Sequence, residues 1–85
     1  MSERILFIED EAAIADTLVY TLESEGFDVH WCQLGREGSA WIEAHPVDLV
    51  VLDIGLPDTS GFEWCRQLRR SSSVPVMFLT ARKEE

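Results

Sequence analysis

The fold of this chain is decided by the stretch VDLVVLDIGLPDTSG, residues 47–61. Five of its first seven residues are apolar, a pattern typical of a strand buried on both faces of a parallel sheet. This run ends in an acid, Asp53, and a turn that contains Gly55 and Pro57 follows. Because ligands of open α/β sheets bind at the carboxyl ends of the strands, we expect Asp53 to lie at a binding edge.

A second group of acids follows an earlier apolar run. Residues Ile5–Ile8 are typical of a strand, and the acidic triplet Glu9-Asp10-Glu11 comes directly after it. Two strands that deliver carboxylates to one edge predict a divalent-cation site, because neighbouring carboxylates repel each other unless a cation neutralises them.

The predicted site contains only oxygen ligands. Asp10 and Asp53 would supply carboxylates, the backbone carbonyl of Gly55 would supply a third oxygen, and Glu9 would act through water. Oxygen ligands favour Mg²⁺, or else Mn²⁺, over Zn²⁺. Thr80 ends the last predicted strand, so its hydroxyl should reach the same edge and could contact a phosphoryl oxygen. A strand-end threonine can also simply cap the segment that follows.

Strand-like and helix-like patterns alternate along the chain. Strands are predicted at 5–8, 27–31, 47–53 and 74–79, and helices at 12–25, 35–44 and 61–70. This βαβαβαβ order predicts a parallel sheet with right-handed crossovers and helices on both faces. In the second helix Ala40 and Trp41 are expected to face inward. In the third helix, which Ser60 would cap, we expect Phe62 and Leu68 on the buried side together with Cys65.

Size and charge limit the possible functions. The 85 residues make one domain, and the 16 acidic and 7 basic side chains give a net charge of −9, which disfavours direct nucleic-acid contact. Apolar runs are strand-length and no signal peptide is visible, so we expect a cytoplasmic protein without a membrane segment. Cys32 and Cys65 lack zinc or redox spacing and are interpreted as buried or half-buried thiols. The three tryptophans are interpreted as packing residues: Trp31, Trp41 and Trp64.

These motifs resemble the receiver domain of two-component response regulators. The resemblance rests on residues 9–11, 53–61 and 74–82 and extends over the whole chain; within the family it is closest to the OmpR/PhoB type of transcriptional regulator. It implies a flavodoxin-like (CheY-like) doubly wound parallel sheet of strand order 2-1-3-4-5, here truncated to βαβαβαβ. Residues 1–85 would then be the N-terminal portion of the domain, without the fourth helix, fifth strand and fifth helix.

The resemblance also implies a mechanism. Asp53 would accept a phosphoryl group from a sensor histidine kinase, and Asp10 with Glu9 would hold the Mg²⁺ ion. Thr80 would contact the phosphoryl group and act as a switch. The domain would be a signalling module with at most autocatalytic phosphotransfer, and a full-length protein would carry a C-terminal DNA-binding domain. The lysine that ends the fifth strand in the family has no counterpart here, because Lys83 stands elsewhere.

Two alternatives remain open at this point. A receiver-like interaction module that cannot be phosphorylated would explain the missing lysine, although the acids are intact. A phosphohydrolase of the haloacid dehalogenase type would need an acid two residues after the nucleophile, where Gly55 stands. Without a fifth strand, Val74–Leu79 would form an apolar sheet edge, so we expect either further residues beyond Glu85 or a homodimer that covers this edge.

Overall fold

Strands and helices alternate along residues 2–79, the part of the chain that the computed structural model describes. In chain order the elements are β1 (Arg4–Ile8), α1 (Ala12–Ser24), β2 (Asp28–Cys32), α2 (Gly35–Ala44), β3 (Leu49–Asp53), α3 (Gly61–Leu68) and β4 (Val76–Leu79). The predicted order is therefore confirmed, and most predicted ends lie within two residues of the observed ones. β4 begins after Pro75, whose nitrogen has no hydrogen to donate to a neighbouring strand.

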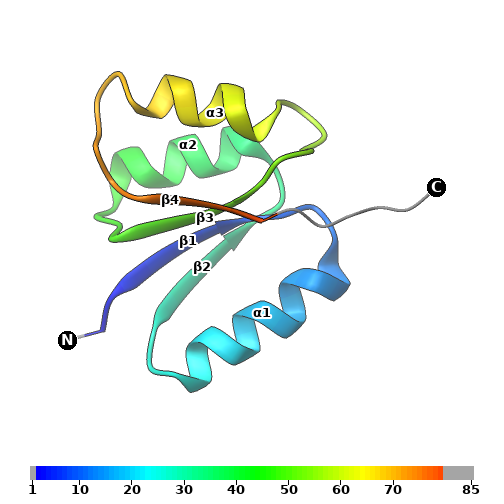
Figure 1. Ribbon diagram of the computed structural model, residues 1–85. Helices are drawn as coiled ribbons and strands as arrows, with labels where there is room; N and C mark the ends of the chain where they lie inside the picture. Colours follow the sequence, from blue (N-terminus) through cyan, green and yellow to red (C-terminus); the bar gives the residue numbers. More distant parts are fainter. Residues whose placement is uncertain (1, 80–85) are drawn as a thin grey trace.

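The strands form one parallel sheet in the order β2-β1-β3-β4. Helices α2 and α3 cover one face and α1 covers the other, as Figure 1 shows. In the β1–β3 register Ile8 lies opposite Leu52, so the residues that follow Ile8 lie beside Asp53. The predicted parallel sheet and its 2-1-3-4 order are confirmed, and the order explains how two acidic segments more than forty positions apart meet.

Side chains of the strands alternate between two apolar cores, one on each face of the sheet. Beneath α2 and α3 the buried cluster includes Leu6, Ile8, Val50, Leu52 and Trp64, and beneath α1 it includes Ile5, Phe7, Ala15 and Val51. Burial on both faces is why β1 and β3 are continuous apolar runs rather than alternating ones.

Two predicted helix faces need correction. Ala40 is exposed, because α2 approaches the sheet through its buried glycines Gly35 and Gly38 instead. Phe62 is also exposed, at 57%, because α3 buries Trp64 and Leu68 on its inner side. Trp41 and Cys65 do pack partly against the core, as predicted.

Strand β4 pairs with β3 and has no second neighbour among residues 2–79, so the predicted sheet edge is observed there. Its Met77 is 57% exposed and its Phe78 38%. The Phe78 ring contacts that of Phe62, with 5.1 Å between the centroids. Within the described range, none of the helices has the length and apolar character that crossing a bilayer requires.

Candidate functional site

Three carboxylates meet at the carboxyl edge of the sheet. Glu9 and Asp10 follow β1, Asp53 ends β3, and one oxygen from each lies within 4.8 Å of the others. Glu9 is fully buried, Asp53 is 2% exposed and Asp10 is half-buried. The structure thus brings together the three carboxylates that the sequence singled out, whereas Glu11 is exposed at the start of α1 and lies outside this cluster.

The acidic segment after β1 is fastened to β2 by its main chain. The amide of Glu9 donates to the carbonyl of Cys32 at 3.0 Å, and the indole Nε1 of Trp31 donates to the carbonyl of Glu9 at 2.7 Å. The Glu9 carboxylate also accepts a hydrogen bond from the amide of Glu11 at 2.9 Å. The sequence alone predicts only a packing role for Trp31, because an indole bond to a backbone carbonyl leaves no pattern in the sequence.

The loop after Asp53 is closed by its own backbone. The amide of Gly61 donates to the carbonyl of Ile54 at 2.7 Å, and Gly55 pairs with Ser60 in an isolated antiparallel bridge. Leu56 is buried beneath the loop, at 9% exposure. These contacts hold the chain next to Asp53 in one path from the end of β3 to the start of α3.

A long-range contact ties the same loop to α2. The carboxylate of Asp58 accepts hydrogen bonds from the amides of Gly35 and Arg36, at 2.9 and 3.0 Å. Burial alone would raise the pKa of the Asp58 carboxyl, but these amides, that of Arg36 foremost, hold the pKa below its ordinary value. Asp58 therefore caps a helix whose own N-cap residue, Leu34, has no side chain that could do so.

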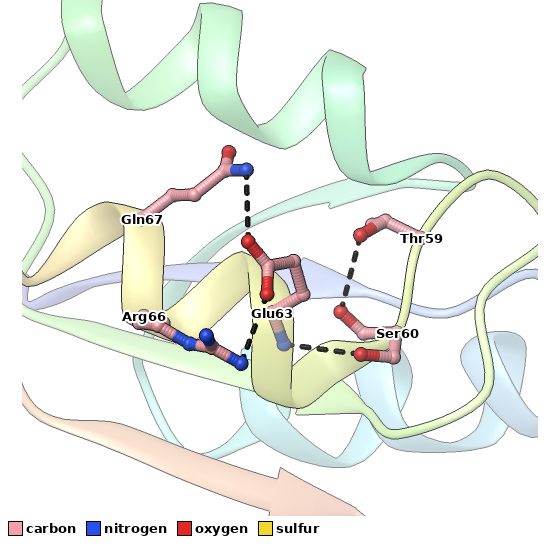
Figure 2. A network of polar contacts seen from close by, with 5 residues as sticks. All are labelled: Thr59, Ser60, Glu63, Arg66 and Gln67. Carbon is pink, nitrogen blue, oxygen red and sulfur yellow. Dashed lines mark hydrogen bonds and ion pairs between the residues drawn. The ribbon is translucent and has the colours of Figure 1, made fainter.

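The other end of the loop is fixed where α3 begins (Figure 2). The hydroxyl of Ser60 accepts from the amide of Glu63 at 3.0 Å, which confirms the predicted N-cap. The Glu63 carboxylate in turn pairs with Arg66 at 3.0 Å and accepts from the side-chain Nε2 of Gln67 at 3.2 Å. These exposed contacts stabilise the first turns of the helix.

The donor set of the cluster fits Mg²⁺. All three side chains offer carboxylate oxygens, which are the ligands that a hard divalent cation prefers, and three acids so close together repel one another without a cation. Gly55 is exposed on the adjacent loop, and its role as a carbonyl ligand stays a prediction. Thr80, the predicted phosphoryl contact, lies outside the described residues, as does Lys83.

A pocket of about 310 Å³ lies at the opposite, amino end of the sheet. It is lined in part by His30, Trp41 and His45, whose rings stack with centroids 3.4 and 3.6 Å apart on the two faces of the indole. Burial, followed by the charge of His45, lowers the pKa of His30. The stacked rings cover each other, and the pocket lies at the opposite end of the sheet from the carboxylates, so the acidic edge is the stronger candidate for the functional site.

A parallel sheet of this strand order, with buried carboxylates at its carboxyl edge, places the protein in the class of flavodoxin-like α/β domains. More specifically, the chain belongs to the response regulator receiver domain family, whose sequence pattern matches residues 5–85. It is thus the receiver domain of a two-component response regulator related to transcriptional regulators of the OmpR/PhoB type, as the sequence motifs predict.

The comparisons give the extent of this likeness. The transcriptional regulatory protein CreB of Escherichia coli K12 is 49% identical over 84 residues, which are 98% of this chain and 37% of CreB. The sequence pattern of residues 14–20 and 61–68 suggests a likeness to CreB, and the identity over the whole match agrees with that interpretation. The chain therefore spans little more than a third of that relative's length.

Solved structures show the same fold. The non-phosphorylated receiver domain of HemR from Leptospira biflexa matches with a TM-score of 0.86 and 33% identity, over 99% of this chain and 68% of that one. A chain from the complex of histidine kinase ThkA with response regulator protein TrrA matches with a TM-score of 0.88 and 31% identity, over 96% and 72% of the two chains.

Proposed function

We propose that Asp53 accepts a phosphoryl group from the phosphohistidine of a sensor histidine kinase. The observation that carries the proposal is the convergence of three carboxylate oxygens within 4.8 Å around the end of β3. In the reaction a carboxylate oxygen of Asp53 forms a bond to phosphorus while the phosphorus–nitrogen bond of the donor breaks, and the imidazole leaves with the electron pair. The product is an aspartyl phosphate.

The residues around Asp53 have separate parts in this proposal. Asp10 and Asp53 would bind Mg²⁺ directly, together with the carbonyl of Gly55, and Glu9 would bind through water. When bound, Mg²⁺ neutralises charge on the transferring phosphoryl group. Thr80 would contact that group after transfer and transmit its presence to the surface, as the switch of the family does.

Asp58 is a competing carboxylate on the loop that follows Asp53, and its environment argues against it as the acceptor. Its two oxygens accept hydrogen bonds from the amides that begin α2. Attack on phosphorus would compete with one of these bonds. Asp53 instead lies beside the two other acids, where a cation would neutralise both the acceptor and the donor phosphate.

The proposed partners follow from the family. TrrA was solved in complex with a histidine kinase, so we propose a kinase of that class as the phosphoryl donor here. We further propose a cytoplasmic protein in which a C-terminal DNA-binding domain contacts the promoter, since a domain of net charge −9 is poorly suited to bind phosphates. The receiver would then act as a signalling switch rather than as an enzyme.

The test uses a full-length protein that contains this domain, treated with acetyl phosphate and Mg²⁺. We expect one phosphoryl group per chain, located on Asp53 by mass spectrometry of peptides, and none in the Asp53→Asn variant, because an amide does not attack phosphorus. Asp58→Asn serves as the matched control and should be labelled normally. Label found on Asp58, or retained in Asp53→Asn, would overturn the assignment. A wild type that binds Mg²⁺ but takes up no phosphoryl group would favour a receiver-like interaction module.

A further inference from the structure

We propose that Trp31 is a positioning residue of the metal site, which it stabilises through the backbone rather than by touching the ion. Its indole Nε1 donates a hydrogen bond of 2.7 Å to the carbonyl of Glu9. That carbonyl belongs to the peptide unit whose nitrogen is the amide of Asp10. Because a peptide unit is planar and stiff, a bond that fixes the carbonyl also fixes the direction in which the chain enters Asp10.

The Trp31 bond is the second hydrogen bond by which β2 holds the acidic segment. The amide of Glu9 donates to the carbonyl of Cys32 at 3.0 Å, so both main-chain polar groups of Glu9 are held by neighbouring residues of β2. Loss of a group that bonds directly to a metal ligand commonly weakens binding by about 10- to 100-fold, and because Trp31 acts one step further away, through the backbone carbonyl of Glu9, its loss should have a smaller effect. Trp31 is half-buried and packs against the core beneath α1, so its ring has little freedom to move.

The other two tryptophans have different surroundings. The indole of Trp64 donates to the carbonyl of Gly35 at 2.8 Å, at the start of α2. Trp41 is stacked between two histidines at the amino end of the sheet. Of the three indoles, only that of Trp31 donates to the segment that carries the acids, among the contacts of residues 2–79. Trp41 is therefore a natural control for effects of removing an indole in general.

This inference rests on the proposed metal site, and the first experiment separates the two. The probe is Mn²⁺ alone, with the free ion measured by electron paramagnetic resonance. Trp31→Phe removes the N–H and keeps an apolar ring, so we expect binding about 3- to 10-fold weaker. Trp41→Phe should bind as the wild type does, and Asp10→Asn should bind far more weakly than either.

The outcomes distinguish a wrong site from a wrong role for Trp31. If Asp10→Asn binds like the wild type, the metal site itself is wrong and the inference fails with it. If Asp10→Asn loses binding while Trp31→Phe keeps wild-type affinity, the site stands and the positioning role of Trp31 is refuted. Val29→Ala, which trims the same core from β2, controls for stability, and its affinity should be unchanged.

A second measurement follows the response of Trp31 to the metal in the wild-type protein, and variants serve only to assign the resonances and as a control. The three indole N–H resonances are resolved by ¹H–¹⁵N NMR and assigned from single Trp→Phe spectra. On titration with Mg²⁺ we expect the Trp31 resonance to shift, the Trp41 resonance to stay, and the Trp31 shift to disappear in Asp10→Asn. A Trp31 resonance that does not respond, while the backbone amides of residues 9–11 do, would refute the inference.

Discussion

Substitution of Gly61 by alanine should displace the loop that carries Asp53. A Cβ at position 61 would lie 2.6 Å from the carbonyl oxygen of Asp53 and 3.0 Å from the Cα of Ile54. Ordinary van der Waals contact begins at 3.4 Å, so the closest approach is about 0.8 Å too short. Both obstacles are backbone atoms, which cannot rotate away as a side chain can, so either the backbone of Asp53 and Ile54 or the start of α3 must shift.

The expected size of the effect follows from this overlap. Forcing an extra methyl group into a packed site costs about 1–3 kcal/mol. The alanine also stabilises the folded state by about 0.4–1 kcal/mol, because it lowers the conformational entropy of the unfolded chain. A net loss of about 1–2 kcal/mol in the free energy of unfolding corresponds to a fall in Tm of roughly 4–16 °C for a domain of this size. A shift of the Asp53 backbone by part of this overlap of about 0.8 Å would also move the Asp53 carboxylate relative to Asp10.

The assay combines thermal unfolding with Mn²⁺ binding and uses Gly55→Ala as its matched control. A Cβ at Gly55 would meet nothing within 4 Å, and the backbone carbonyl there is retained. We therefore expect Gly55→Ala to keep both stability and metal affinity, whereas Gly61→Ala loses stability and weakens binding at least tenfold. Equal affinities in Gly61→Ala and the wild type would refute the link between this contact and the site.

Three further predictions concern single side chains. Asp58→Ala should lower the free energy of unfolding in urea by about 1 kcal/mol through loss of the helix cap, and an unchanged urea midpoint at pH 7 would contradict the capping role. Because the pKa of Asp58 is lowered on folding, this contribution should be present at neutral pH and vanish as pH falls below about 4. Burial, and next the charge of His45, lowers the pKa of His30 on folding. The contribution of His30 to the free energy of unfolding should therefore be full above about pH 6.5 and be lost as pH falls through the folded-state pKa. Tm measured from pH 7.5 to 5 should depend less on pH in His30→Gln than in the wild type, and identical profiles would contradict this. Burial raises the pKa of the Cys32 thiol to about 11, so a thiol reagent at pH 8 should label the half-buried Cys65 first, and faster labelling of Cys32 would be the contrary result.

Much of the fold and the location of the acids could be predicted because both depend on local patterns. Buried strands are apolar runs, and parallel strands place whatever follows them at one edge, so Glu9, Asp10 and Asp53 could be expected to meet. Helix faces were less predictable. Phe62 and Trp64 are both large and aromatic, and periodicity alone does not tell which of two candidate faces meets the sheet. The observed choice buries Trp64, which also finds a hydrogen-bond acceptor, and leaves Phe62 exposed against Phe78.

The supports of the site could not be predicted, since each joins parts of the chain that are distant in sequence. Trp31 holds the Glu9 carbonyl across 22 positions, and Asp58 caps α2 across 23. Hydrogen bonds of this kind combine a side chain with a backbone group, which every residue possesses, so they leave no pairing of residue types to recognise.

A place where the backbone packs closely against other atoms is easier to recognise in a sequence, because only glycine fits there. A Cβ at Gly35 would lie 2.6 Å from the Cγ2 of Thr59 and 3.1 Å from the Cδ1 of Trp64. The start of α2 therefore rests directly on the loop that follows Asp53, at the place where Asp58 caps the helix. A bulky residue at position 35 would push α2 and the loop apart and break the cap. The same packing that buries the helix thus also holds the loop that follows the proposed phosphoacceptor.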